Sequence, residues 1–350
     1  MSNYKDKKNV EIRQKANEII DELPDYVNEY FMAREISLSA MSIYSYAGQL
    51  RTFFEFLSSS NSYFKAKSIK EISFEDLDNL NDADVTEFLH HLRNYPEKDA
   101  NGNVTYITCS DRTISHYMVA LNTFWKYLVA HGMVKTNPIA MLSRKRLNKK
   151  EVIYLNKEEK EEFLEAVEEG TGLTKRQAKY HEKNSIRDKA IMLTFLSTGI
   201  RVSELVGMDL KDISFKKHSI NVFRKGGNFD RVYFSDTAEA ALQEYLEIRE
   251  KRYSPAKDET AVFLNRDGKR ISVRSVEILV KKYINASLPH EADRITPHKL
   301  RSTFAETMLK ATGGDLERVQ KLLGHSSITS TMHYVDSTEA EKEEVRNLSI

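Results

Sequence analysis

Cysteine is nearly absent from this sequence, in which Cys109 is the single one among 350 residues. One thiol can form neither an internal disulfide nor a zinc site built from several cysteines. Long apolar runs are missing as well, since none approaches the roughly 18 residues of a membrane helix. The first residues, Met1–Lys8, lack the apolar core of a secretion signal. We therefore expect a cytoplasmic protein that makes no contact with a membrane.

An excess of charge of one sign is also missing, because 53 Lys and Arg residues stand against 52 Asp and Glu residues. A net charge of +1 argues neither for nor against nucleic acid, since basic patches can lie on otherwise acidic domains. No Gly-x-x-x-x-Gly-Lys-Ser/Thr loop occurs, so we expect no reaction driven by ATP. At 350 residues the chain fits two globular domains, each with its own core.

The first half of the sequence predicts a helical domain. Apolar residues recur at helical spacing in residues 39–57, 74–93 (with an interruption near Asn81) and 113–130. Between the last two segments, residues 96–103 are rich in turn formers and predict a loop. A basic run without acids follows the helices. It is either a solvated linker or a strap that lies on a phosphate backbone.

The second half predicts helices around a small sheet. Residues 219–223 and 231–234 have strand character on either side of Gly226-Gly227, which is the pattern of a hairpin. Residues 262–264 are a candidate third strand, and the chain after Val273 is helical again. The predicted fold class is therefore mainly α with a small antiparallel β-sheet.

Two segments in the first part of this half carry candidate functional residues. Arg201 stands at a predicted helix start, and Glu204, three residues later, shares its helix face. Lys225 stands at the tip of the predicted hairpin. Taken alone, each segment is better explained in the ordinary way, by an ion pair within a helix and by a solubilising lysine.

Two further segments come later. His298 and Arg301 follow Pro297 at a helix start and project from one side, which suits a phosphate group. His325 follows a helix-ending glycine, and Tyr334 comes nine residues after it. A surface histidine beside an arginine and a packing tyrosine are the ordinary alternatives.

In this order and at these spacings, the four segments resemble the tyrosine recombinase and phage integrase family across the whole second half. The helices at Ser42–Leu57 and Thr113–Leu128 are similar to the family's helical (SAM-like) core-binding domain. The length, the Leu23-Pro24-x-Tyr26 opening and the extra segment 170–184 are most similar to Xer-type recombinases, in particular the XerS-like single-recombinase subgroup.

The resemblance implies a C-shaped DNA clamp with defined parts. They are an N-terminal extension (1–22), a helical core-binding domain (23–143), a basic linker (144–154), a tyrosine recombinase catalytic domain (155–336) and a C-terminal tail for protomer exchange (337–350).

The resemblance also implies a role for each candidate residue in making a 3′-phosphotyrosine intermediate. Tyr334 attacks the phosphate, and its proton passes to His298. Catalysis is otherwise positioning and charge stabilisation, so no metal and no other cofactor is implied. The remaining roles are these: Arg201, Arg301 and His325 hold the non-bridging oxygens, Lys225 protonates the leaving 5′ oxygen, and Glu204 orients Arg201.

The implied partner is double-stranded DNA with inverted half-sites. Phosphate contacts are expected from Arg144, Lys145, Arg146, Lys149 and Lys150, and base contacts from Ser115, His116, Arg274 and Lys281. Two positions depart from the family pattern: His116 stands where relatives often have Arg, and Ser302 where many have a second His. A homotetramer on two duplexes is implied, which is a monomer or dimer when free. The resemblance leaves room for a division-associated accessory protein.

The implied activity is site-specific recombination that resolves chromosome dimers at a dif-like site, in support of chromosome partition at cell division. The main alternative is the integrase of a mobile element, although the residues before Leu23 are too few for the arm-binding module that integrases often add. A type IB topoisomerase shares this catalytic set. A non-catalytic DNA-binding protein is disfavoured because every catalytic position is filled.

Overall fold

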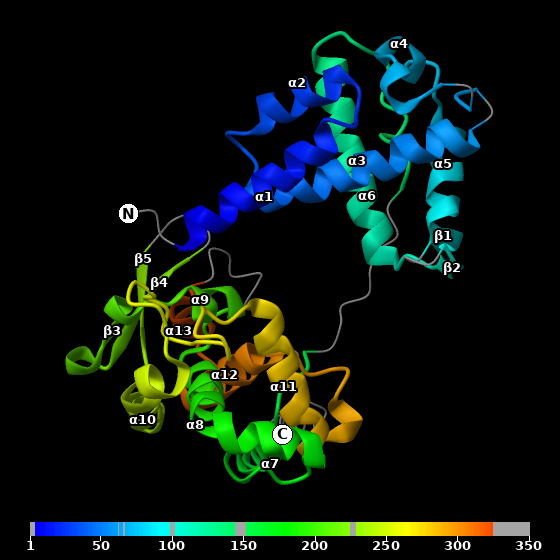
Figure 1. The fold of residues 1–350 in the computed structure, drawn as a ribbon. Coiled ribbons are helices and arrows are strands. Elements are labelled where there is room, and N and C mark those ends of the chain that lie inside the picture. The colour runs from blue at the N-terminus through cyan, green and yellow to red at the C-terminus, as the bar shows by residue number, and fades with distance from the viewer. Residues whose placement is uncertain are drawn as a thin grey trace, which may run out of the picture. The chain divides into compact units, whose positions relative to one another are not determined.

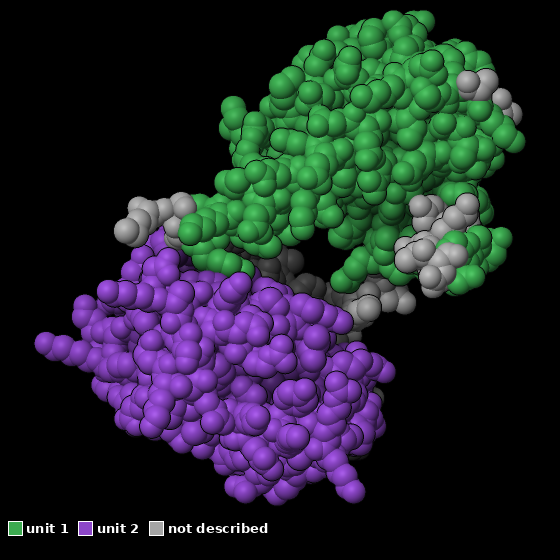
Figure 2. All heavy atoms as spheres, viewed as in Figure 1, with its two compact units in different colours: residues 1–149 green, residues 150–350 purple. Residues whose placement is uncertain are grey.

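The computed structural model describes residues 4–61, 63–65, 67–98, 102–143, 152–224 and 229–324. The chain divides into two compact units, residues 1–149 and residues 150–350, each of which is considered by itself below (Figure 2). The described residues form helices and two small antiparallel sheets, which agrees with the predicted fold class. None of the described helices is both long and apolar enough to cross a membrane.

The first unit is a bundle of helices (Figure 1). Its elements are α1 (Tyr4–Ile20), α2 (Asp25–Arg34), α3 (Ala40–Ser60), α4 (Phe74–Leu77), α5 (Asp82–His91) and α6 (Asp111–Ala130), with short 3₁₀ turns at Ile69–Glu71 and Leu92–Asn94. The interruption expected near Asn81 is confirmed, because the Asn81 side chain accepts hydrogen bonds from the first turn of α5. Helix α1 lies along α3, and its Ala16 and Ile20 belong to the same core as the rest of the unit.

Aromatic rings fill the core of this unit. Trp125 and Phe124 on α6 are fully buried, with ring centroids 5.5 Å apart. Phe53 on α3 lies 5.5 Å from the Trp125 ring, and Tyr30 on α2 lies 5.2 Å from the Phe124 ring. These edge-on contacts join three helices through one cluster, which aromatic quadrupoles favour over face-to-face stacking.

The loop expected at residues 96–103 is wrong in part. Strands β1 (Tyr95–Lys98) and β2 (Val104–Ile107) pair antiparallel, with Tyr95 opposite Ile107 and Lys98 opposite Val104. The β-branched and aromatic run of β2 favours extended backbone, and Gly102, two residues before β2, has a positive φ of +83°, which glycine adopts readily.

The second unit surrounds the long helix α8. Its helices are α7 (Lys157–Glu169), α8 (Lys175–Thr198), α9 (Val202–Gly207), α10 (Asp236–Tyr253), α11 (Val273–Ser287), α12 (Pro297–Ala311) and α13 (Leu316–Leu323), with 3₁₀ turns at Leu210–Asp212, Phe215–Lys217 and Pro289–Glu291. Helices α7, α10 and α12 all pack on α8, whose central residues are buried on every side.

A three-stranded sheet completes this unit, in the order β3 (Ile213–Ser214), β4 (Ser219–Phe223), β5 (Phe229–Tyr233). The predicted hairpin is confirmed, with Ser219 opposite Tyr233 and Phe223 opposite Phe229. The expected third strand at 262–264 is wrong, because that segment makes only isolated bridges and the third strand is β3.

A buried polar network joins the start of α8 to α11. The Tyr283 hydroxyl donates to Asp188 Oδ2 at 2.8 Å and lies 3.0 Å from His181 Nδ1. Lys282 Nζ donates to the same carboxylate oxygen at 3.0 Å. Burial, followed by the charge of Asp188, raises the pKa of Tyr283 far above its ordinary range, so this phenol stays protonated and donates. The network fixes α11 against α8.

Replacement of Phe124 with Ala tests the aromatic cluster. We expect the free energy of unfolding of the first unit to fall by about 3–5 kcal/mol, because the deletion opens a cavity at the centre of the core. Urea unfolding followed by the fluorescence of Trp125, the single tryptophan, measures the change. The exposed Tyr106→Ala is the control, with an expected change within about 0.5 kcal/mol. Equal effects of the two substitutions would contradict a packed aromatic core.

Candidate active site

The junction between α8 and α9 positions Arg201. Helix α8 ends at Thr198, and Gly199 adopts a φ of +60°, which lets the chain turn directly into α9. A side chain is also excluded at this position, because a Cβ on Gly199 would lie 2.2 Å from the ring of Phe304. The next residue, Ile200, is fully buried, so Arg201 stands at the N-terminal cap of α9 on a rigid turn.

Glu204 holds Arg201 in place. Its Oε2 accepts the backbone N–H of Arg201, and its Oε1 accepts from Arg201 Nη1, both at 2.8 Å. The Glu204 side chain is only 4% exposed, whereas that of Arg201 is 36% exposed. The carboxylate is thus a buried anchor, and the guanidinium that it orients reaches the surface.

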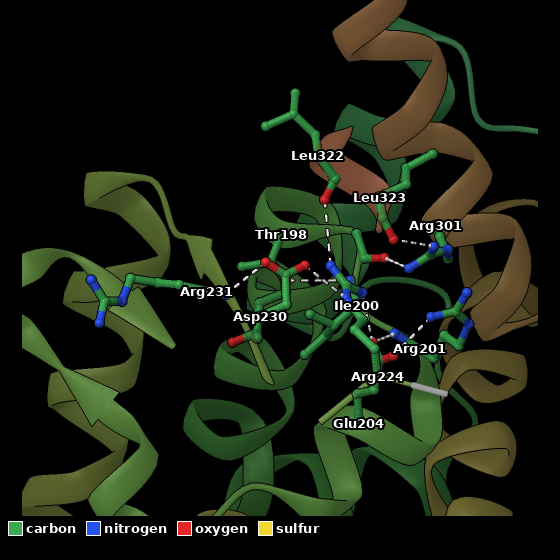
Figure 3. A network of polar contacts seen from close by, with 12 residues as sticks. Thr198, Ile200, Arg201, Glu204, Arg224, Asp230, Arg231, Arg301, Leu322 and Leu323 are labelled. Carbon is green, nitrogen blue, oxygen red and sulfur yellow. Dashed lines mark hydrogen bonds and ion pairs between the residues drawn. The ribbon is translucent and has the colours of Figure 1, made fainter. Parts of the chain in front are cut away.

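Arg301 lies where the ends of two helices meet, although it belongs to α12. It is 1% exposed, and it donates from Nη1 to the carbonyl of Gly199 at 2.5 Å and from Nη2 to the carbonyl of Leu323 at 2.7 Å. Carbonyls at helix C-termini lack partners within their own helix, and a cation there is favoured by the helix dipole. Arg301 therefore connects the ends of α8 and α13 to the first turn of α12 (Figure 3).

His298 occupies the first turn of α12 and is exposed at the surface, although neighbouring protein atoms displace part of the water around its ring. Desolvation, followed by the positive charges of Arg301, Lys299 and Arg201, holds the pKa of His298 below its ordinary value. His298 lies three residues before Arg301 on α12, and Arg301 bonds to the carbonyl of Gly199, two residues before Arg201. A neutral imidazole at neutral pH is able to accept a proton.

Ser302, one of the two departures from the family pattern, is a buried residue of α12, one helical turn after His298. Its hydroxyl donates to the carbonyl of His298 at 3.3 Å, as serine often does within a helix. The residue therefore contacts the backbone of α12.

Arg224 is a member of this group that the sequence analysis did not single out. It follows β4 and is 5% exposed. Figure 3 shows its guanidinium between Glu204, Asp230 on β5 and the end of α13. Nη1 donates to Glu204 Oε2 at 3.1 Å, Nε to Asp230 Oδ2 at 3.0 Å, and Nη2 to the Leu322 carbonyl at 3.4 Å. The sequence did contain one sign of this ion pair, because Arg224 and Asp230 stand on opposite sides of the predicted hairpin.

The structure places the other candidates as follows. Lys225, His325 and Tyr334 lie outside the described residues, as do Arg144, Lys145, Arg146, Lys149 and Lys150.

In the first unit, Ser115 is half-buried and His116 is exposed near the start of α6. Arg274 and Lys281 lie on the exposed face of α11, where they pair with Glu277 at 3.3 Å and Asp293 at 2.8 Å. The described residues include no cluster of three or more His, Cys, Asp or Glu that could hold a metal ion.

Replacement of Glu204 with Gln tests the buried anchor. We expect the free energy of unfolding to fall by about 3 kcal/mol, because the substitution removes the negative charge between two arginines, of which Arg224 is itself buried. Chemical denaturation followed by circular dichroism measures the loss. The control is Glu250→Gln, whose carboxylate is 70% exposed beside Arg249, with an expected change within about 0.5 kcal/mol. A Glu204→Gln variant as stable as the wild type would refute the anchor.

Curated relatives resemble the chain over nearly its whole length. The tyrosine recombinase XerS of Streptococcus gordonii is 33% identical over 347 residues, which cover 93% of this chain and 95% of the relative. XerS of Streptococcus agalactiae (strain NEM316) is 34% identical over 343 residues, which cover 92% of this chain and 94% of the relative.

Solved structures share the fold. The XerH site-specific recombinase bound to a palindromic difH substrate matches with a TM-score of 0.63 and 22% identity, over 90% of this chain and 81% of that one. The Tn1549 transposon integrase in complex with circular intermediate DNA matches with a TM-score of 0.63 and 18% identity, over 96% and 98%. Residues 153–341 match the Phage integrase family, and this match contains the whole group built around Arg201 and Arg301. The chain therefore belongs to the phage integrase family and is a tyrosine recombinase.

Proposed function

We propose that this recombinase cleaves and rejoins DNA strands through a 3′-phosphotyrosine intermediate formed by Tyr334. The observation that carries the proposal is the arrangement of Arg201, Arg301 and His298. Glu204 anchors Arg201, Arg301 donates to the carbonyl of Gly199, two residues before Arg201, and His298 lies three residues before Arg301 on α12. Two guanidinium groups beside a neutral imidazole suit a phosphodiester, whose attack by a nucleophile builds negative charge on the phosphorus oxygens.

Arg201 and Arg301 are the proposed ligands of the two non-bridging oxygens. Arg301 is held by backbone carbonyls of two helices, and Arg201 by a buried carboxylate. A donor fixed before the substrate arrives needs no reorganisation during the reaction, and this applies to Arg201, whose side chain is 36% exposed. Arg301 is 1% exposed, so in this proposal DNA binding must uncover its guanidinium. His325 is proposed to donate to the same oxygens.

Proton transfers complete the proposed reaction. Tyrosine has an ordinary pKa of about 10, so the Tyr334 phenol needs a base at neutral pH. His298 is the proposed base, supported by the lowered pKa that keeps its imidazole neutral. Lys225 is proposed to give a proton to the leaving 5′ oxygen. The bond energy is kept in the phosphotyrosine, so a 5′ hydroxyl from another strand can displace Tyr334 and reseal the DNA.

We further propose that the target is a dif-like chromosomal site with inverted half-sites, and that two duplexes are held by a homotetramer. The support is the similarity to XerS proteins over more than nine tenths of the chain. In this proposal residues 23–143 and 155–336 bind the duplex from two sides, the tail 337–350 docks on a neighbouring protomer, and the reaction takes place in the cytoplasm. The basic residues of the linker 144–154 contact phosphates, and Ser115, His116, Arg274 and Lys281 contact bases.

A mobile-element integrase is the second candidate, because the fold similarity to the Tn1549 integrase covers 96% of this chain. The two candidates share the chemistry and differ in the DNA that they join. Recombination between two chromosomal dif-like sites supports the first candidate, and recombination that requires the ends of an element supports the second.

Replacement of Tyr334 with Phe tests the nucleophile. On a nicked suicide duplex we expect a denaturation-resistant protein–DNA adduct with the wild type and none with the variant. Duplex affinity should stay within about 3-fold, because phosphate contacts by cations dominate binding. The matched control is Tyr63→Phe, at an exposed tyrosine of the first unit, which should form the adduct normally. An adduct that persists without the Tyr334 hydroxyl would assign the nucleophile to another residue.

The pH dependence of cleavage tests His298. The folded-state pKa lies below the ordinary value of about 6.5. The neutral base should therefore persist as the pH falls to 6.5, and the single-turnover rate should decline only at lower pH. His298→Gln should slow cleavage by about 10²-fold and remove this acid limb.

His218→Gln is the control for this profile. His218 is exposed, and its hydrogen bond to Glu239 raises its pKa above the ordinary value. The control should retain both the rate and the acid limb. An acid limb above pH 6.5 that disappears in His218→Gln would contradict the assignment of the base to His298.

A further inference from the structure

The buried guanidinium of Arg224 connects three segments of the second unit, one of which carries the proposed active-site residue Arg201. It bonds to Glu204, which orients Arg201, to Asp230 on β5, and to the Leu322 carbonyl near the end of α13. The arginine is 5% exposed, so its contacts are internal to the protein. The proposed reaction assigns no step to it.

We propose that Arg224 is a positioning residue that holds Arg201, through Glu204, and the end of α13 in one arrangement for cleavage. The inference rests on the proposed function, because Arg201 must act on the scissile phosphate for its position to matter. Three features of the contacts carry it.

The first feature is the way in which Glu204 is shared. Oε2 accepts from the backbone N–H of Arg201 at 2.8 Å and from Arg224 Nη1 at 3.1 Å, while Oε1 accepts from Arg201 Nη1 at 2.8 Å. A buried carboxylate is stable only when charges and hydrogen bonds satisfy it. Arg224 therefore fixes the rotation of the carboxylate that presents Oε1 to the Arg201 guanidinium.

The second feature is the fit against Gly324. A Cβ at this glycine would lie 2.6 Å from Arg224 Nε and 2.9 Å from its Cζ, closer than real contacts allow. The guanidinium thus packs directly on the backbone at the end of α13. Arg224 and Arg301 take the neighbouring carbonyls of Leu322 and Leu323, so two arginines from different elements cap this helix.

The third feature is the geometry of the side chain itself. One planar guanidinium directs three N–H groups to three separate partners at the same time. A lysine at this position would keep the positive charge, but its compact ammonium cannot reproduce the fork. A substitution of Arg224 with Lys therefore separates the effect of the positive charge from the effect of the three directed hydrogen bonds.

Arg224→Lys tests the inference, with Arg249→Lys as the matched control. Arg249 is also buried, at 1% exposed, and it donates to the carbonyls of Ala261 and Val262. The single-turnover rate of adduct formation is measured on the nicked duplex at saturating DNA, together with duplex affinity and melting temperature. We expect Arg224→Lys to slow cleavage by about 10²-fold with little change in affinity, because misplacement of a catalytic group costs rate. The control should keep its rate even where its melting temperature falls equally.

A double substitution shows whether the effect passes through Glu204. Because Glu204 orients Arg201, Glu204→Gln should itself slow cleavage. If Arg224 acts by holding this carboxylate, Arg224→Lys should add little to that loss of rate, since residues that act as a unit are not additive. A rate loss in the double variant equal to the product of the single losses would overturn the proposed path.

Two glycine substitutions test the same contact without touching Arg224. Gly324 and Gly313 have nearly equal φ values of +61° and +64°, but a Cβ at Gly313 meets nothing within 4 Å. Both Ala variants carry the same backbone strain, and only Gly324→Ala displaces the guanidinium. We expect Gly324→Ala to slow cleavage by about 10²-fold and Gly313→Ala to cleave like the wild type.

The outcomes separate this inference from the proposed function. Wild-type cleavage with Tyr334 as nucleophile, combined with normal rates for both Arg224→Lys and Gly324→Ala, overturns the inference alone. A wild type that forms no adduct, or an adduct that survives in Tyr334→Phe, overturns the proposed function instead. Rate losses in Arg224→Lys and Gly324→Ala, without losses in the two controls, support the inference.

Discussion

The arrangement of the second unit depends on one buried carboxylate between two arginines. Glu204 is nearly inaccessible to water, so its charge must be balanced by Arg201 and Arg224, and these residues come from different elements. Burial of a carboxylate costs free energy of desolvation, and a buried carboxylate without a partner costs still more. The backbone segments that carry its partners are therefore held in a narrow range of positions. The turn at Gly199, the hairpin and the end of α13 all meet at this point.

Several helix starts and the hairpin of this unit could be predicted from the sequence, because the patterns that indicate them lie within a few neighbouring residues. A glycine before Arg201 indicated the helix start, strand patterns on either side of Gly226-Gly227 indicated the hairpin, and Pro297 indicated the start of α12. The proximity of Arg201, His298 and Arg301 is not a local property, and the sequence supplied it only through resemblance to a family. Their contacts with Glu204, Gly199 and Leu323 then follow from the fold.

The parts that the sequence did not predict are those decided by tertiary contacts. Arg224 follows a strand like many surface arginines, and only the folded structure shows that it is buried. The third strand, β3, has two residues, which are too few to leave a periodic pattern. Helix α1 is largely polar and exposed, and its place in the core comes from Ala16 and Ile20, with Ile19 packed beside them. The strands β1 and β2 are similarly short, and turn formers dominate the segment between them.

The hydrogen bond between His181 and Tyr283 has a consequence for how this protein can diverge. His181 lies in the first half of α8, Asp188 lies two turns further along the same helix, and Tyr283 lies on α11. The buried Tyr283 hydroxyl therefore has partners from two turns of α8, and the Asp188 carboxylate depends on α11 in return. A substitution of Tyr283 alone, or of His181 and Asp188 alone, would leave polar atoms without partners in the interior, so these positions on α8 and α11 must change together.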